Sequence, residues 1–139
     1  MPVYHQHISF STKGETDIVD ITDRVEQAVA QSGVKAGIVN VFVSGSTAGI
    51  TTIEYESGLV QDLKEAMERL APRHASYAHD SRWGDGNGYA HIRASLLGCS
   101  LAVPVEDGRT ALGQWQQIVL VDFDNRRRNR NIVLTVVGD

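Results

Sequence analysis

Residues 77–98 constrain the fold of this chain most strongly, because so polar and glycine-rich a segment cannot lie in a hydrophobic core. The segment holds two of the five histidines, one of the two tryptophans and four of the thirteen glycines. It then runs into a plausible helix. Functional groups concentrate on irregular segments that a rigid scaffold holds in place. We therefore expect residues 77–98 to lie at the surface and to carry a functional site.

The bulk composition narrows the class of protein. A chain of 139 residues predicts one domain over residues 1–139. A net charge of −4 and a pI near 5.7 argue against nucleic acid or an acidic membrane as the main partner. No apolar run approaches the roughly 20 residues that span a bilayer, and a single cysteine, Cys99, suits a reducing compartment. The expectation is a cytoplasmic soluble domain.

Several segments have the residue pattern of strands. The clearest is Val3–Thr12, in which side chains of two kinds alternate. Further strands are predicted over Ile38–Val43, Ile50–Tyr55, Ser100–Val105, Gln114–Phe123 and Asn131–Val137. The last two flank residues 124–130 and predict a hairpin.

Three segments have the pattern of helices. Thr22 is expected to cap one that Gly33 ends, and Gly88–Leu97 to form a short one ended by Gly98. Ser57 is expected to cap the clearest helix, whose apolar face comprises Leu59, Val60, Leu63, Ala66, Met67 and Leu70. The fold class is therefore α+β, with a mixed or largely antiparallel sheet and two to three helices.

The first candidate site comprises His79, Asp85, Asn87 and His91. Asn87 and His91 are four residues apart and share a helix face if the helix begins near Asn87. Neutral imidazoles are common ligands of divalent metals and also serve in acid–base catalysis. The alternative is a hydrogen-bonded helix histidine beside ordinary turn chemistry. Spacing alone leaves both open.

The second candidate is the loop Gly45–Gly49 between two predicted strands. Its small residues allow backbone N–H groups to approach an anion, and Ser46 and Thr47 add hydroxyls. The alternative is a glycine-rich connection between two strands that binds nothing, and the pattern alone favours this alternative. Glu54 follows in a strand that is otherwise apolar or hydroxyl-bearing, where a carboxylate needs solvent, a partner or a metal.

The third candidate is the arginine cluster between residues 126 and 130. Guanidinium groups bind phosphate or carboxylate through two parallel hydrogen bonds. Arg126 and Arg127 are expected at a solvated hairpin tip. Arg128 and Arg130 share a strand face by alternation, so either could point into a site.

The environments of one tryptophan and of the single cysteine can also be predicted. Trp115 is expected in the core or at an interface, with Gln114 and Gln116 on the opposite face as candidate ligand contacts. Cys99 is expected to be a small buried residue, since no base lies near it in the sequence.

The order of these motifs resembles the YjbQ family over nearly the whole chain. The resemblance rests on Gly45–Glu54, the helix around Asp62, Tyr77–His79, Gly86–His91, Gly98–Ser100, Val103–Val105, Leu112–Gln116, the arginine cluster and the closing Val136–Gly138. Many members carry His-Thr where this chain has Gly45-Ser46. The usual Gly-Thr-Trp-Gln reads Gly-Gln-Trp-Gln here, ending at Gln116.

The resemblance implies an α+β homotrimer with a polar cleft that contains the two histidines. It also implies secondary thiamine-phosphate synthase activity, a transferase reaction that joins an aminopyrimidine diphosphate to a thiazole phosphate and releases diphosphate. His79, His91 and Glu54 are then the expected catalytic residues. The expected substrate contacts are Ser46, Thr47, Asn87, Gln116, Arg128 and Arg130.

The cofactor expectation is a divalent ion, Mg or Zn, on His79 and His91, with Gly45 in place of a third family histidine. The same residues would also suit a metal-dependent phosphohydrolase or a non-catalytic binder of a phosphorylated metabolite. An interaction module is a further alternative. The residues alone do not choose among these functions.

Overall fold

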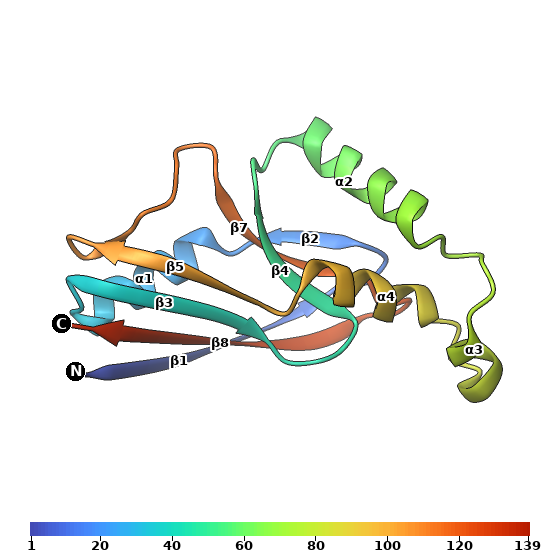
Figure 1. The fold of residues 1–139 in the computed structure, drawn as a ribbon, viewed down its shortest axis with the longest axis horizontal. Helices are drawn as coiled ribbons and strands as arrows, with labels where there is room; N and C mark the ends of the chain where they lie inside the picture. The colour runs from blue at the N-terminus through green and yellow to red at the C-terminus, as the bar shows by residue number, and fades with distance from the viewer.

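Two antiparallel sheets form the scaffold, as a computed structural model of residues 1–139 describes it (Figure 1). The strands are β1 (Val3–Thr12), β2 (Asp17–Asp20), β3 (Ala36–Val43), β4 (Ala48–Ile53), β5 (Ser100–Glu106), β6 (Arg109–Thr110), β7 (Gln117–Asp122) and β8 (Arg128–Gly138). The helices are α1 (Thr22–Ser32), α2 (Ser57–Leu70), α3 (Ala78–Trp83) and α4 (Gly88–Leu97). The predicted α+β class is confirmed.

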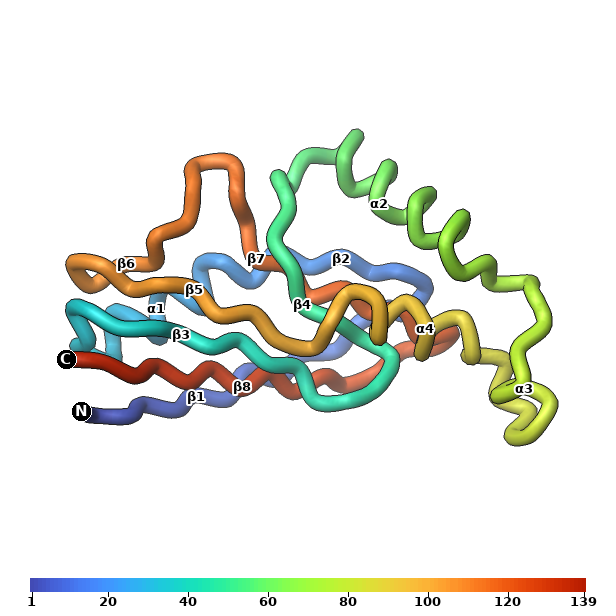
Figure 2. The backbone as a smooth tube through the Cα atoms, in the orientation of Figure 1, coloured from blue at the N-terminus to red at the C-terminus, as the bar shows by residue number.

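The larger sheet has the strand order β1-β8-β3-β5-β6, and the smaller has the order β2-β7-β4. β1 pairs with β8 along its whole length, from Val3 opposite Val137 to Thr12 opposite Arg128. The backbone trace shows how the two long strands bring both termini to one end of the molecule (Figure 2). The first residue of β8, Arg128, therefore lies at the other end of the molecule from the two termini.

The hairpin predicted between the last two strands is wrong. β7 pairs with β2 and β4 in the smaller sheet, whereas β8 pairs with β1 and β3 in the larger one. The chain therefore crosses from one sheet to the other between Phe123 and Arg127. As a result, Asp122 belongs to the smaller sheet and Arg128 begins a strand of the larger one.

β7 is buried on both faces. Ile118 and Leu120 belong to the large core between the sheets, while Val119, Val121 and Phe123 belong to a second core beneath the helices. Side chains alternate along a strand, so Asp122 and Asp124 point to the same side as Leu120. Both carboxylates are thereby directed toward the larger sheet and β8.

α2 is only lightly embedded, and Figure 1 shows it at the outer edge of the molecule. Only Met67 of its apolar face is buried, and Leu70 is 65% exposed. The predicted cap is wrong, because the N-cap residue is Glu56, whose carboxylate accepts from the N–H groups of Gly58 and Leu59. These bonds lower the pKa of Glu56. A carboxylate at a helix N-terminus also meets the positive end of the helix dipole.

Arg93 of α4 ties the end of α2 to the body of the protein. Its buried guanidinium donates to the carbonyl of Ala71 at 3.0 Å, the hydroxyl of Thr16 at 3.1 Å and the carboxylate of Glu68 at 2.5 Å. It also lies 4.8 Å from the ring centroid of the buried Tyr89. One side chain thus joins Glu68 of α2 and Ala71, which ends that helix, to Thr16.

Three further expectations change. Thr22 is the first residue of α1 rather than its cap, and its hydroxyl accepts from the Ile118 N–H. Cys99 is exposed rather than buried. Trp115, expected in the core or at an interface, is 67% exposed and therefore does not lie in the core. α3 was not predicted, since its six residues show no apolar periodicity. None of the helices has the length and apolarity to cross a membrane.

Candidate functional site

Three segments far apart in the sequence enclose a polar cavity of about 430 Å³. They are the connection from β3 to β4, the corner between α3 and α4, and the first residues of β8. The cavity is lined by Gly45, Ser46, Thr47, His79, Trp83, Asp85, Asn87, His91, Arg128 and Arg130. Nine residues were expected from the sequence to act in catalysis or to contact the substrate. Seven of them lie together in this cavity: Ser46, Thr47, His79, Asn87, His91, Arg128 and Arg130.

The two imidazoles lie against each other in this cavity. His79 comes from α3 and His91 from α4, and their ring centroids are 4.5 Å apart with planes tilted by 47°. Nδ1 of His79 is shielded from solvent and has no hydrogen-bond partner; the nearest carboxylate oxygen, of Asp80, is 3.5 Å away. That same oxygen accepts from the N–H of Gly88 at 2.8 Å. Asp80 thus lies between His79 and the start of α4.

Arg130 is held rigidly behind the cavity. Its Nε and Nη2 donate to the two carboxylate oxygens of Asp122 at 2.7 and 2.8 Å, and Nη2 also donates to Thr47 at 2.6 Å. The hydroxyl of Thr12 and the backbone N–H of Asp124 also donate to Asp122. Asp122 is fully buried and Arg130 nearly so. A bidentate pair of this kind fixes the orientation of the guanidinium as well as its charge.

Arg128 is held by a second buried carboxylate, that of Asp124. Its Nε donates to Asp124 at 2.5 Å, and the Thr47 hydroxyl donates to the same carboxylate oxygen at 3.1 Å. Burial opposes ionisation of Asp124, but hydrogen bonds from Arg128, the Asn125 backbone and Asn87 outweigh it and hold the pKa of Asp124 below its ordinary value. Arg128 itself is one-third exposed.

Asn87 joins the same network from the N-cap position of α4. Its Nδ2 donates to Asp124 at 3.4 Å, and its Oδ1 is buried without a partner. An ionised carboxylate only accepts hydrogen bonds, so the amide must point its Nδ2 toward Asp124. Asp124 therefore orients side chains from three cavity segments: Thr47, Asn87 and Arg128.

Two predicted site residues do not lie in this cavity. Glu54 is exposed and follows the far end of β4 from Thr47, a separation of roughly 20 Å at the rise of a strand. Its carboxylate satisfies its need for a polar environment in solvent. Gln116 is in the connection from β6 to β7, where its Oε1 accepts from the Gly113 N–H at 3.0 Å and its Nε2 donates to Thr52.

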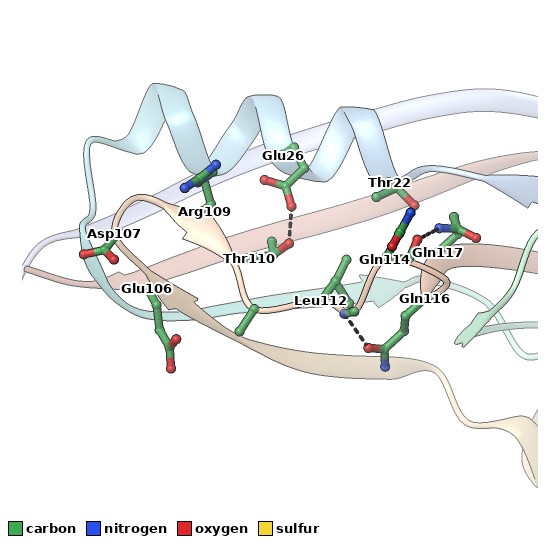
Figure 3. Close-up of a pocket in the computed structure, with 12 residues that line it drawn as sticks. Thr22, Glu26, Glu106, Asp107, Arg109, Thr110, Leu112, Gln114, Gln116 and Gln117 are labelled. Carbon is green, nitrogen blue, oxygen red and sulfur yellow. Dashed lines mark hydrogen bonds between the residues drawn. The ribbon is translucent and has the colours of Figure 1, made fainter.

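Gln116 belongs to a different and larger cleft, of about 500 Å³, between α1 and the connection from β6 to β7 (Figure 3). Its polar side chains are already engaged within the chain: Thr110 donates to the Glu26 carboxylate, and the Gln117 amide donates to the backbone carbonyl of Gln114. The cleft contains no imidazole and one arginine, Arg109. The smaller cavity, which contains two histidines and two arginines, is therefore the better candidate for ligand binding or catalysis.

The donor set of the smaller cavity fits a resident metal ion incompletely. His79 and His91 offer two imidazoles, but no group of three or more His, Cys, Asp or Glu side chains is arranged to hold a metal. Structural zinc takes four protein ligands and catalytic zinc three. The Mg or Zn ion expected from the sequence thus stays a prediction.

Sequence reasoning missed the two residues that organise the cavity, Asp122 and Asp124. A signal for them was present, because Asp122 directly follows a continuous apolar run and Asp124 comes two residues later, after Phe123. Arg128 and Arg130 then follow at short spacing. Charged residues at the end of a fully buried strand require partners, and the nearest cations are those arginines.

The fold and the cavity define a class: an α+β protein of two antiparallel sheets, with an arginine- and histidine-lined cavity at the point where the chain changes sheet. The chain belongs to the YjbQ family. The family described as "UPF0047 protein YjbQ-like" matches residues 6–139.

Individual relatives agree with this assignment. A UPF0047 protein of Archaeoglobus fulgidus is 41% identical over 91% of this chain and 96% of its own. A UPF0047 protein of Methanothermobacter thermautotrophicus is 40% identical over 99% of this chain and 94% of its own. The crystal structure of a YbjQ-like protein of unknown function from Sulfolobus solfataricus has a TM-score of 0.95 at 38% identity, covering 99% of both chains.

Proposed function

We propose that this protein binds a small phosphorylated metabolite in the cavity between His79, His91, Arg128 and Arg130. One observation carries the proposal: both arginines are anchored from behind by buried carboxylates, and their remaining nitrogens make no hydrogen bond within the chain. These are Nη1 of Arg130 and both terminal nitrogens of Arg128. Free guanidinium N–H groups at a cavity wall suit the oxygens of a phosphate.

The anchoring bears on affinity. A guanidinium already fixed by Asp122 or Asp124 loses little conformational entropy when a ligand binds. The carboxylates also neutralise the formal charge of the arginines, so attraction for an anion depends on directed hydrogen bonds and on the imidazoles. We therefore expect binding that depends more on the geometry of the oxyanion than on its total charge.

For the reaction, we propose transfer of the thiamine-phosphate synthase kind, with release of diphosphate. The free N–H groups of Arg128 and Arg130 would stabilise charge on the departing diphosphate through directed hydrogen bonds, which meets the main electrostatic demand of such a displacement. In this displacement the bond from the pyrimidine methylene carbon to the diphosphate oxygen breaks, and a bond from that carbon to the thiazole nitrogen forms. His79 or His91 would donate a proton to the departing diphosphate oxygen. The number of polar donors around one cavity supports this proposal.

A phosphohydrolase is the second candidate, and the contact between the two imidazoles favours it, since one histidine could take a proton from an attacking water. A hydrolase releases inorganic phosphate from simple phosphoesters with no second substrate. A synthase needs both substrates. A non-catalytic binder shows saturable affinity and no turnover, and measuring products with one or both substrates separates the three functions.

The binding proposal is tested by calorimetric titration with inorganic phosphate and diphosphate. Arg128→Ala should weaken binding about tenfold or more, because a charge-assisted hydrogen bond contributes about 1.5–3 kcal/mol. Arg127→Ala is the matched control, since Arg127 is an exposed neighbour that lines no cavity. Equal affinities of the two variants and the wild type would reject the site. Elemental analysis of the purified protein, with and without phosphate, tests the expected divalent ion.

We also propose a homotrimer in the cytoplasm. Trp83 and Trp115, each 67% exposed, and Leu96, 61% exposed, support an assembly that covers apolar surface. The free exposed thiol of Cys99 suits a reducing compartment. Light scattering of the purified protein should give three times the mass of one chain, and a monomer mass would reject the trimer.

A further inference from the structure

Gly45 lies directly over the guanidinium of Arg130. It is exposed, has a φ of +115°, and joins β3 to β4. A Cβ atom built at this position would lie 2.7 Å from Nη1 of Arg130 and 3.9 Å from its Cζ. No other atom outside its neighbours comes within 4 Å of that Cβ. A side chain here would therefore cover Nη1 of Arg130.

The guanidinium cannot move aside at low cost. Its Nε and Nη2 are bound to Asp122, and Nη2 is also bound to Thr47. Asp122, Thr47 and Arg130 are all buried. Displacing Arg130 would leave Asp122 as a buried carboxylate without its cation, which is strongly unfavourable. The space above Nη1 is consequently open only because residue 45 lacks a side chain.

Nη1 is also the nitrogen of Arg130 that remains for a ligand. The other two are used within the chain, and Nη1 makes no hydrogen bond there. Gly45 and Arg130 both line the cavity that holds His79 and His91. An oxyanion bound at Nη1 would lie against the bare backbone of Gly45.

We propose that Gly45 is a specificity-determining residue, which opens Nη1 of Arg130 to a phosphate oxygen. This inference rests on the proposed function and deepens it, because it names the atom that receives the anion and the residue that controls access to it. A side chain at position 45 would stand between Nη1 of Arg130 and the cavity. Because its Cβ would lie 2.7 Å from that nitrogen, the exposed loop must shift to admit it while the buried network holds Arg130 in place.

The test compares the affinity of Gly45→Ala and the wild type for inorganic phosphate by calorimetry. Gly33→Ala is the matched control for backbone strain, because Gly33 also has a positive φ, +74°, and a Cβ there meets nothing within 4 Å. We expect Gly45→Ala to lose affinity about tenfold and Gly33→Ala to keep the wild-type affinity. Equal affinity of Gly45→Ala and the wild type would overturn the inference and leave the proposed function intact.

A second measurement does not depend on the variant folding. In wild-type protein with 15N-labelled arginine, the Arg130 guanidinium resonances should shift on addition of phosphate, while those of the exposed Arg24 should not. Unchanged Arg130 resonances at saturating phosphate would overturn the inference. Failure of the wild type to bind phosphate at all would instead reject the proposed function, and the inference with it.

Discussion

Arg130 and Asp122 form a buried bidentate ion pair between the two sheets, with nitrogen–oxygen distances of 2.7 and 2.8 Å. Asp122 ends β7 of the smaller sheet, and Arg130 lies near the start of β8 of the larger one. The pair therefore fastens the sheets together directly beneath the cavity. Its value for stability depends on both partners being present.

Asp122→Asn should destabilise the protein by about 3–5 kcal/mol, because it leaves a buried arginine without its counter-charge. Urea denaturation followed by circular dichroism measures this loss. Asp62→Asn, on the exposed side of α2, is the control and should change the free energy of unfolding little. A loss below about 1 kcal/mol in Asp122→Asn would show that the pair does not hold the sheets together.

Asp124 predicts how stability responds to acid. The ordinary pKa of an aspartate is 3.8, and the value for Asp124 is lowered in the folded protein. Between these two values the unfolded chain binds more protons, so stability is fully present above pH 3.8 and is lost as the pH falls through the lowered pKa. The free energy of unfolding, measured against pH, should therefore fall more steeply for the wild type than for Asp124→Asn. Parallel curves would contradict this role.

Tyr89 predicts a response to alkali. Burial, reinforced by the nearby charge of Glu15, raises the pKa of Tyr89 to about 12. The ultraviolet titration of the wild type minus that of Tyr89→Phe should therefore show a phenol with a midpoint near 12, and in denaturant this should return to 10.0. The corresponding stability is present below pH 10 and is lost as the pH rises toward 12. A midpoint near 10 in the folded protein would be inconsistent with burial of the phenol.

Arg93→Ala should loosen α2 more than the rest of the protein. The change removes three hydrogen bonds and the contact with Tyr89, an expected cost of about 2 kcal/mol. Hydrogen exchange should accelerate across α2 while β3 remains protected. Arg24→Ala, on an exposed position of α1, should leave both patterns unchanged, and uniform acceleration across the chain would argue against a local tether.

Local patterns predicted the elements well where one period dominated. The alternation in Val3–Thr12 gave β1 with its observed bounds, and Gly98 ended α4 as expected. Pairing was not accessible in the same way, because two neighbouring strands look alike whether they form a hairpin or join different sheets. The continuous apolar run from Ile118 to Val121 was the available clue, since a strand buried on both faces does not suit a two-stranded ribbon.

The cavity was predictable in its parts and not in its framework. His79, His91, Arg128 and Arg130 are residue types whose chemistry is apparent in isolation. Asp122 and Asp124 act by orienting other side chains, and that role exists only once the crossing between the sheets brings β7 next to β8. Glu54 lies outside the cavity because β4 is extended from Ala48 to Ile53 and carries the chain away from Thr47 at the rise of a strand.

The crossing between the sheets has a consequence for finding the ligand. A molecule that binds Arg128 and Arg130 contacts side chains whose positions depend on both sheets. The two sheets separate when the protein unfolds. Ligand binding is therefore coupled to melting of the entire domain, and a ligand at 100 times its dissociation constant adds about 2.7 kcal/mol to the free energy of unfolding. Melting temperature alone would thus identify ligands in a library of phosphorylated compounds, before any reaction has been assayed.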